Sequence, residues 1–130
     1  MGIFDAILGS NKKEAENKTF LQWIPLTSIE QLKKIKEQSI TETIFIFKHS
    51  TRCSISSMVK KQFEKLFAEE HKNIKVYYLD LLNYRNVSDQ IPVIFKVEHQ
   101  SPQLLVIKNQ VAVYNASHYN IAQINLNTLR

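Results

Sequence analysis

The sequence predicts an α/β domain with a central mixed four-stranded sheet flanked by helices, and two observations carry this prediction. Four short runs of β-branched and aromatic residues, at about 43–48, 74–81, 103–107 and 111–114, have the composition and length of strands. Around these runs, apolar residues recur every three or four positions, which is typical of helices with one buried face. The chain has 130 residues, 44% of them hydrophobic, so it suits one domain with one core.

We place the first residues outside this domain. Residues 1–19 hold a short apolar patch followed by a polar stretch, and we interpret them as an N-terminal extension to a domain over 20–130. The patch lacks the charged start and the longer apolar segment of a signal peptide. No apolar run approaches the roughly 18 to 20 residues that cross a bilayer. We therefore expect a soluble, cytoplasmic protein that does not associate with a membrane.

The domain is expected to open with an extended segment followed by a helix. Trp23 and Pro25 indicate the extended segment, because proline disfavours a helical conformation at the residue before it. Ser28 and Gln31 have the spacing of a capping box, in which each side chain bonds the backbone N–H of the other residue. Apolar residues follow at positions 29, 32 and 35. This pattern predicts a helix that starts at residue 29 and buries one face.

A βαβ unit is predicted next. The run 43–48 is almost entirely apolar, which is typical of a strand buried on both faces. A helical pattern extends from Ile55 to about Glu70, and Asn73 is a candidate for the left-handed position that ends a helix. The run 74–81 then supplies a second strand. Two strands joined through a helix in this way should be parallel, with a right-handed crossover.

A third helix is predicted over about 87–97. Asn86 and Ser88 are its candidate N-caps. Pro92 should either delay the start of this helix or kink it, because proline lacks the backbone N–H that a helix interior uses.

The last two β runs are separated by so few residues that they predict an antiparallel hairpin. Its turn, at 108–110, needs a residue with positive φ. Asn109 is the best candidate, because both glycines of the chain lie in its first nine residues. Beyond the hairpin, we expect a loop over 115–119 and a final helix over about 120–129.

The only cysteine, Cys53, lies where the central strand gives way to a helix. A thiol there faces unpaired N–H groups and the positive end of the helix dipole, with Lys48, His49 and Arg52 close in sequence. These features favour the thiolate. An isolated cysteine is usually a buried, inert side chain, but its place in a polar turn favours a reactive thiol here. A single cysteine also excludes an internal disulfide and a multi-cysteine zinc site.

The predicted element order is that of the thioredoxin fold, in which the active-site loop follows the first core strand. Residues 51–56 read Thr-Arg-Cys-Ser-Ile-Ser, residues 101–103 read Ser-Pro-Gln, and residues 115–118 read Asn-Ala-Ser-His. This combination resembles the monothiol bacilliredoxins of the YtxJ type, thioredoxin-like proteins linked to the thiol bacillithiol. The similarity covers roughly residues 20–130. In that family a proline usually follows the cysteine, and Ser54 stands in its place here.

The resemblance implies a thiol–disulfide oxidoreductase that removes bacillithiol from S-bacillithiolated client proteins through a mixed disulfide on Cys53. It also implies that Pro102 is a cis-proline beside the sulfur, where the backbone of Ser101 pairs with the bound thiol substrate. Bacillithiol enters as a co-substrate, and no tightly bound cofactor is expected. The predicted substrate contacts, the first three of them for an anionic partner, are Ser50, Thr51, Arg52, Ser54, Ser56, Ser101 and Pro102.

A lone thiol constrains the reaction. Dithiol redox proteins use a C-x-x-C pair in which the second cysteine resolves the first, and Ser56 occupies that second position here. Cys53 must therefore attack a mixed disulfide and keep the small thiol on itself. A second small thiol or a separate reductase would then remove it.

A non-catalytic thioredoxin-like module, in which Cys53 only senses oxidation or the domain acts as an adaptor, is the main alternative. His118 is a candidate base for a Cys–His hydrolase, but we favour a loop histidine near the rim of the fold. His49 is either an electrostatic neighbour of the thiol or a packing residue.

Charge and histidine spacing argue against two further kinds of site. The formal net charge of +5 suggests nucleic acid, but the basic residues are spread along the helices and interleaved with glutamate, which favours solvated faces. His71 and His99 lack the spacing of metal ligands. We expect neither nucleic-acid binding nor a metal site.

Overall fold

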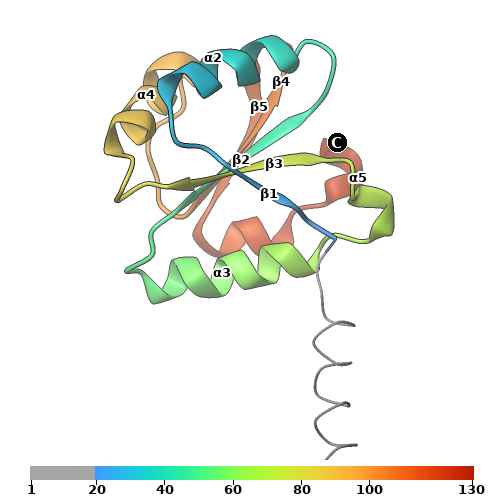
Figure 1. Cartoon of the computed structure of the whole chain (residues 1–130). Coiled ribbons are helices and arrows are strands. Elements are labelled where there is room, and N and C mark those ends of the chain that lie inside the picture. Colours follow the sequence, from blue (N-terminus) through green and yellow to red (C-terminus); the bar gives the residue numbers. More distant parts are fainter. Residues whose placement is uncertain (1–19) are drawn as a thin grey trace, which may run out of the picture.

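The computed structural model describes residues 20–130, and the predicted N-terminal extension lies outside the described residues. Figure 1 shows helices packed on both faces of a central sheet. The elements follow in the order β1 (Trp23–Pro25), α2 (Ile29–Gln38), β2 (Ile44–His49), α3 (Ser54–Lys65), the 3₁₀ helix η1 (Glu69–His71), β3 (Lys75–Asp80), α4 (Arg85–Phe95), β4 (Gln103–Lys108), β5 (Val111–Ser117), the 3₁₀ helix η2 (His118–Gln123) and α5 (Leu126–Leu129). No helix within residues 20–130 has the length and apolar character needed to cross a bilayer.

The sheet has five strands in the order β1-β3-β2-β4-β5. β3 is parallel to both β1 and β2, whereas β4 is antiparallel to β2 and β5. The predicted α/β class with a mixed sheet is thus confirmed, and the expected four strands become five. The added strand is the segment Trp23–Pro25, which pairs with β3 from Val76 to Tyr78. Its three residues are too short, and too close to proline, to show a strand pattern in the sequence.

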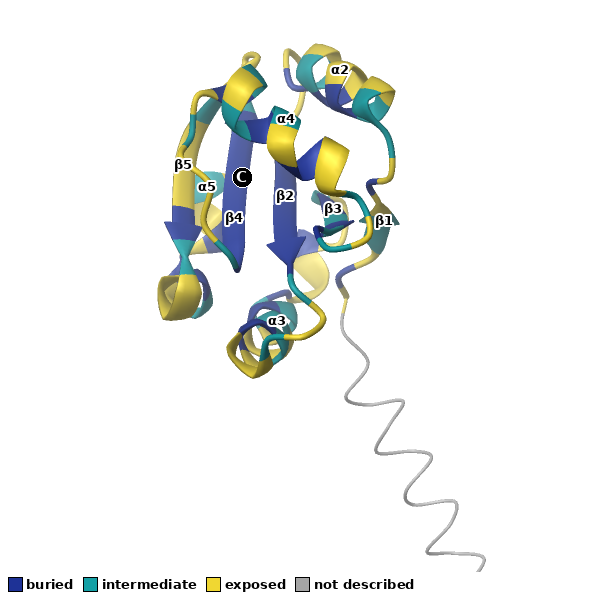
Figure 2. Ribbon diagram, turned by 90° about the vertical axis from the view of Figure 1, so that its left-hand side faces the viewer, coloured by how far each residue is buried: buried dark blue, intermediate teal, exposed yellow. Residues whose placement is uncertain are grey.

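β2 lies at the centre of the sheet and all six of its residues are buried. Figure 2 shows β2 and β4 buried along most of their length, whereas β5 is largely exposed. Side chains alternate along a strand, so Phe45 and Phe47 join the core under α3, η2 and α5. Ile44 and Ile46 join the core under α2 and α4. The prediction of a strand buried on both faces is correct.

Local signals near the first helix and the hairpin turn were predictive. Ser28 and Gln31 form the expected capping box at the start of α2. Asn109 takes the predicted positive φ of 50°, and Gln110 beside it also has a positive φ, of 72°. These features depend on a few neighbouring residues, which is why the sequence reveals them.

Helix ends in the middle of the chain differ from the predictions. α3 ends at Lys65 instead of near Glu70, and Asn73 is not left-handed. The chain turns early because His71 is buried, with its Nδ1 accepting a hydrogen bond from the backbone N–H of Ala68 at 2.9 Å. The Nε2 of His71 also lies 3.0 Å from the side-chain oxygen of Asn127.

α4 starts at Arg85, earlier than predicted, and neither Asn86 nor Ser88 caps it. Its N-cap is Tyr84, whose side chain makes no capping hydrogen bond. Pro92 lies inside the helix, which continues to Phe95. Burial of Val87, Ile91 and Phe95 against the sheet therefore decides the extent of this helix.

The end of the chain is also built differently. β5 continues to Ser117, through most of the predicted loop, because its residues 115–117 pair with the start of β4. The predicted final helix over 120–129 is replaced by η2 and the four-residue α5. Ile121, Ile124 and Leu126 are all buried under α3. Their uneven spacing fits two short helical pieces better than one continuous helix.

Candidate functional site

Cys53 lies in the turn that joins the carboxyl end of β2 to α3, as predicted. It is the N-cap residue of α3, with extended backbone angles, φ −103° and ψ 119°. Its backbone N–H donates to the carbonyl of Ser50 at 3.2 Å, and its carbonyl accepts from the N–H of Ser57 at 3.1 Å. The residue is half-buried and carries a free thiol. Cys53 is thus partly exposed to solvent at the start of a twelve-residue helix.

Ser56 and His49 support this turn from beneath. The hydroxyl oxygen of Ser56 accepts from the backbone N–H of Ser50 at 3.1 Å and lies 2.6 Å from Nδ1 of His49. Both side chains are buried. Burial, and next the positive charge of Lys60, lower the pKa of His49, so its ring is neutral at pH 7. The ring of His49 also packs on Tyr78, with centroids 5.6 Å apart.

This arrangement gives Ser56 a different place from the one predicted. Ser56 was expected to contact substrate, but its hydroxyl is fully buried and already bonded to Ser50 and His49. It therefore holds the turn that carries Cys53. His49 is a packing residue, and its ring also forms a hydrogen bond with Ser56 in the turn that carries Cys53.

The remaining predicted contacts beside the thiol lie at the surface. Thr51, Arg52 and Ser54 are exposed, and Ser50 is half-buried. They flank Cys53 in the chain, so exposed hydroxyl groups and the positive charge of Arg52 lie next to the thiol in sequence. A charged guanidinium at a surface turn is well suited to pair with an anionic group of a ligand.

The segment before β4 reaches the same end of the sheet. The Ser101–Pro102 peptide bond is cis, as the resemblance implies. Gln103, the next residue, pairs with Lys48 near the end of β2. The carbonyl of Pro102 accepts from the backbone N–H of His118 at 3.0 Å. The three sequence segments that carry the resemblance are therefore tied to one end of the sheet.

Two buried side-chain oxygens within residues 20–130 have no hydrogen-bond partner, and both lie at this end. One is Oγ of Ser101, next to the cis-proline. The other is Oδ1 of Asp80, the last residue of β3, which pairs with His49. Buried polar atoms are almost always bonded in folded proteins. This end of the sheet thus keeps hydrogen-bonding capacity that the fold does not use.

Comparison with known proteins decides the family. The model of the monothiol bacilliredoxin BrxC family matches residues 24–126. The chain belongs to the monothiol bacilliredoxin family. Its match to a solved structure described as a candidate oxidoreductase with a thioredoxin fold has 33% identity and a TM-score of 0.66, over 76% of this chain and 85% of that one.

Structures of thioredoxins agree with this fold. The thioredoxin of Trypanosoma brucei brucei is 16% identical, with a TM-score of 0.64 over 80% of this chain and 85% of that one. The thioredoxin of Fasciola hepatica is 17% identical, with a TM-score of 0.61 over 76% and 89%. At this identity the likeness concerns the fold alone. The bacilliredoxin family and the oxidoreductase fold together give this protein a thiol redox role.

This bacilliredoxin also has a buried lysine close to the site. Lys48, in β2, is fully buried, and its Nζ lies 2.6 Å from Nδ1 of His99 and 3.2 Å from Oε1 of Gln103. Burial lowers the pKa of Lys48 to about 8, while the negative charge of Asp89 acts in the opposite direction. Sequence reasoning placed Lys48 only as a charge near Cys53. A lysine inside an otherwise apolar buried run was the signal that it could have used.

The remaining two histidines, His71 and His118, differ in burial. His118 is exposed, but it is the first residue of the 3₁₀ helix η2 and does not lie in the predicted loop. His71 packs against the C-terminal segment through Asn127. Across residues 20–130, no three His, Cys, Asp or Glu side chains cluster so that they could hold a metal ion.

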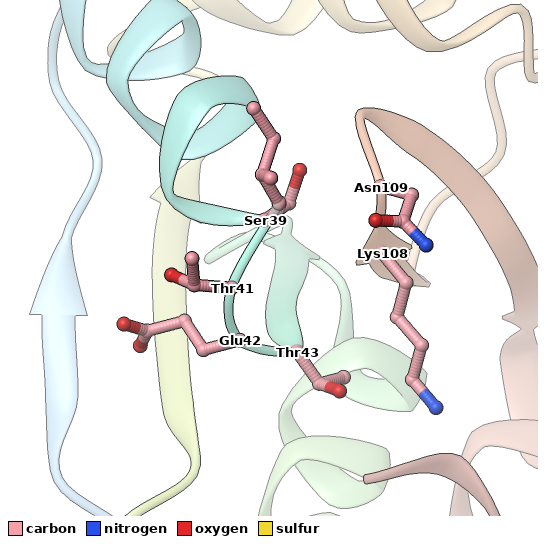
Figure 3. Close-up of a pocket in the computed structure, with 7 residues that line it drawn as sticks. Ser39, Thr41, Glu42, Thr43, Lys108 and Asn109 are labelled. Atoms are coloured by element: carbon pink, nitrogen blue, oxygen red, sulfur yellow. The ribbon is translucent and has the colours of Figure 1, made fainter.

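An open pocket of about 230 Å³ lies at the other end of β2. Figure 3 shows Ser39, Thr41, Glu42 and Thr43 on one side of it and Lys108 and Asn109 on the other. These residues come from the α2–β2 loop and the β4–β5 turn. Because β2 runs from this pocket toward Cys53, the hollow and the thiol occupy opposite ends of the strand.

Proposed function

We propose that this protein is a monothiol thiol–disulfide oxidoreductase that removes bacillithiol from S-bacillithiolated proteins. The observation that carries the proposal is the pairing of a half-buried lone Cys53 at the start of α3 with the cis Ser101–Pro102 segment at the same end of the sheet. Membership of the bacilliredoxin family supports bacillithiol as the small thiol.

The reaction consists of two thiol–disulfide exchanges. The Cys53 thiolate attacks the bacillithiol sulfur of the mixed disulfide. The bond between the client sulfur and bacillithiol breaks, the client leaves as a thiolate and takes a proton, and a disulfide forms between Cys53 and bacillithiol. A second bacillithiol thiolate, or a thiolate of a separate reductase, then attacks that disulfide. This attack breaks the disulfide of Cys53, which leaves as a thiolate, and forms bacillithiol disulfide or a mixed disulfide between bacillithiol and the reductase. The two electrons that reduce the client are thus supplied by the small thiol or the reductase.

The surroundings of Cys53 suit this sequence of steps. Ser56 cannot close a disulfide with Cys53, so the mixed disulfide must wait for an external thiol. Thr51 and Arg52 are exposed, and their hydroxyl and positive charge can bind an anionic group of the small thiol. The backbone of Ser101 would pair with the bound disulfide, and its unpartnered hydroxyl offers one more hydrogen bond.

The test uses a folded protein whose single surface cysteine has been modified with bacillithiol. We expect the client to lose the mass of bacillithiol and Cys53 to gain it, as read by intact-protein mass spectrometry, with turnover once free bacillithiol is added. Cys53→Ser keeps the size of the side chain and should abolish both signals. Thr43→Ala, in the pocket at the other end of β2, should leave them unchanged.

Two results would count against the proposal. A folded protein that leaves the modified client intact contradicts any exchange with bacillithiol. Capture of bacillithiol on Cys53 without release by free thiols or by a reductase-containing extract would instead fit the alternative, a redox-sensing or adaptor module.

A further inference from the structure

Lys48 is an unusual residue for its position. It lies in β2, the central strand, and its side chain is fully buried among groups on the α2 and α4 side of the sheet. Removing an ammonium group from water is costly unless the group is well hydrogen-bonded. An aliphatic side chain of similar volume would fill the same space. The contacts of the Lys48 amine therefore indicate what it contributes.

The amine connects β2 to the segment that precedes the cis-proline. A protonated lysine only donates, so Nδ1 of His99 accepts at 2.6 Å and Oε1 of Gln103 accepts at 3.2 Å. Burial and the nearby charge of Lys48 lower the pKa of His99, which keeps that ring neutral and able to accept. Lys48 thus binds both ends of the segment 99–103.

Gln103 extends the connection into the backbone of this segment. Its Oε1 also accepts from the N–H of Gln100 at 3.2 Å, and its Nε2 donates to the carbonyl of Glu98 at 3.0 Å. Between Phe95 and Gln103 the chain has no helix or strand. The hydrogen bonds of the Gln103 side chain therefore hold this segment in place of the backbone hydrogen bonds of a helix or sheet.

We infer that Lys48 is a positioning residue, which through Gln103 and His99 holds the backbone of 98–101 in place to align a disulfide substrate with Cys53. The inference rests on the proposed function, because it concerns the pairing of that substrate with Ser101. Exchange requires the attacking, central and leaving sulfurs to align, and loss of alignment by about 1 Å can slow a reaction by roughly 100-fold.

The support for the loop is separate from the support for the thiol. Side chains alternate along β2, so Lys48 faces α4 whereas His49 faces α3 and bonds Ser56. A change at Lys48 should therefore alter the alignment of a disulfide without altering the turn that carries the sulfur. This separation makes the inference testable with two reagents.

The experiment compares wild type with Lys48→Met, which keeps the buried volume and removes the amine. Lys108→Met is the matched control, a strand lysine in β4 at the opposite end of the sheet. Two rates are measured for Cys53: alkylation by iodoacetamide, and exchange with a peptide that carries one S-bacillithiolated cysteine. Amide hydrogen exchange of residues 98–101 reports the state of the loop.

For Lys48→Met we expect exchange with the peptide disulfide to slow about tenfold, alkylation to stay within about twofold of wild type, and hydrogen exchange at Gln100 to accelerate. The control should match wild type in all three. Equal slowing of alkylation and disulfide exchange, or a wild-type rate of disulfide exchange, overturns the inference.

If Lys48→Met does not fold, as judged by circular dichroism, Gln103→Met replaces it, because it removes the Lys48–Gln103 contact together with the bonds of Gln103 to Glu98 and Gln100. A wild-type rate of disulfide exchange for Gln103→Met is equally contradictory. If wild type itself does not react with the peptide disulfide, the proposed function fails and the inference fails with it. If wild type reacts and the variant reacts equally fast, only the inference fails.

Discussion

The amino and carboxyl ends of β2 handle their buried polar groups in different ways. At the amino end, the hydroxyl of Ser39 donates to the carbonyl of Lys36 at 2.6 Å and accepts from the N–H of Gln110 at 2.8 Å. The N–H of Asn109 donates to the carbonyl of Ser39 at 2.7 Å. These bonds join the α2–β2 loop to the β4–β5 turn around the open pocket of Figure 3. Polar groups here serve to hold two loops together.

At the carboxyl end, hydrogen bonds support a reactive turn, and part of the polar surface is left unused. Ser56 and His49 hold the Cys53 turn from one face of the sheet, and Lys48 and Gln103 hold the cis-proline segment from the other. Oδ1 of Asp80 and Oγ of Ser101, the only unpartnered buried side-chain oxygens in residues 20–130, both lie here.

This comparison shows that the presence of a pocket does not by itself indicate where the reactive thiol lies. The open pocket lies at the amino end of β2, whereas the thiol lies at the carboxyl end, where two buried side-chain oxygens have no hydrogen-bond partner. Ligand sites of open α/β sheets lie beyond the carboxyl ends of the parallel strands, and β2 and β3 both point toward Cys53. Unused buried polar atoms and a buried lysine identify the functional end more directly than a hollow does.

The largest stability effect expected at the carboxyl end comes from Lys48. Its pKa is about 8 in the folded protein and 10.5 in the unfolded chain, so between these values the unfolded state binds more protons. Stability should therefore rise with pH across this window. The difference corresponds to at most about 3 kcal/mol.

Urea unfolding of wild type and Lys48→Met from pH 7 to 10.5 measures this effect, because groups that do not interact with Lys48 titrate alike in both proteins. Above pH 8, the free energy of unfolding of wild type should rise steadily relative to that of Lys48→Met. Below pH 8, the difference between the two free energies should stay constant. A difference between the two proteins that stays constant up to pH 10.5 would show that burial does not depress the pKa of Lys48.

Ser39 and Ser56 are buried serines near opposite ends of β2, and they allow a matched comparison of these ends. Ser39 and Ser56 each make two hydrogen bonds through one buried hydroxyl. Replacement of either by alanine should cost about 1 to 2 kcal/mol of stability. Only Ser56→Ala should also slow the reaction of Cys53 with iodoacetamide, by several fold, because only Ser56 holds the turn that carries the thiol.

Chemical unfolding and alkylation rates, measured on both variants, check this expectation. If Ser39→Ala slows the alkylation of Cys53 as much as Ser56→Ala does, the two ends of β2 do not differ in their effect on the thiol, and the prediction is wrong.

The smallest expected effect concerns Ser54, the residue that replaces the family proline. Ser54 is the first residue of α3, and Cys53 before it has extended backbone angles, which a following proline tolerates. Ser54→Pro should therefore stabilise the protein by about 0.4 to 1 kcal/mol, mainly by restricting the unfolded chain. The alkylation rate of Cys53 should change by less than about twofold, since the N–H of the first helical residue has no partner inside a helix.

The midpoint of thermal unfolding and the alkylation rate test this substitution together. Destabilisation would mean that the N–H or the hydroxyl of Ser54 has a role in this turn that proline cannot fill.

Sequence patterns were sufficient for features that depend on neighbours along the chain. The strand-to-helix junction at Cys53, the capping box of Ser28 and Gln31, and the positive φ of Asn109 all follow from a few adjacent residues. Short runs of β-branched and aromatic residues predicted most strands, and apolar residues at every third or fourth position predicted most helices, for the same reason. The resemblance carried the cis form of the Ser101–Pro102 bond, which composition alone would not have predicted.

Tertiary structure alone decided the features that depend on partners far along the chain. β1 exists because Trp23–Pro25 finds an edge of β3, and α3 ends early because His71 is buried against the C-terminal segment. Lys48 and His49 face opposite sides of the sheet because side chains alternate along a strand, and the helices packed on each side decide what each of them contacts. The sequence by itself determined where the thiol lies along the chain, whereas contacts between distant segments determined which side chains support it.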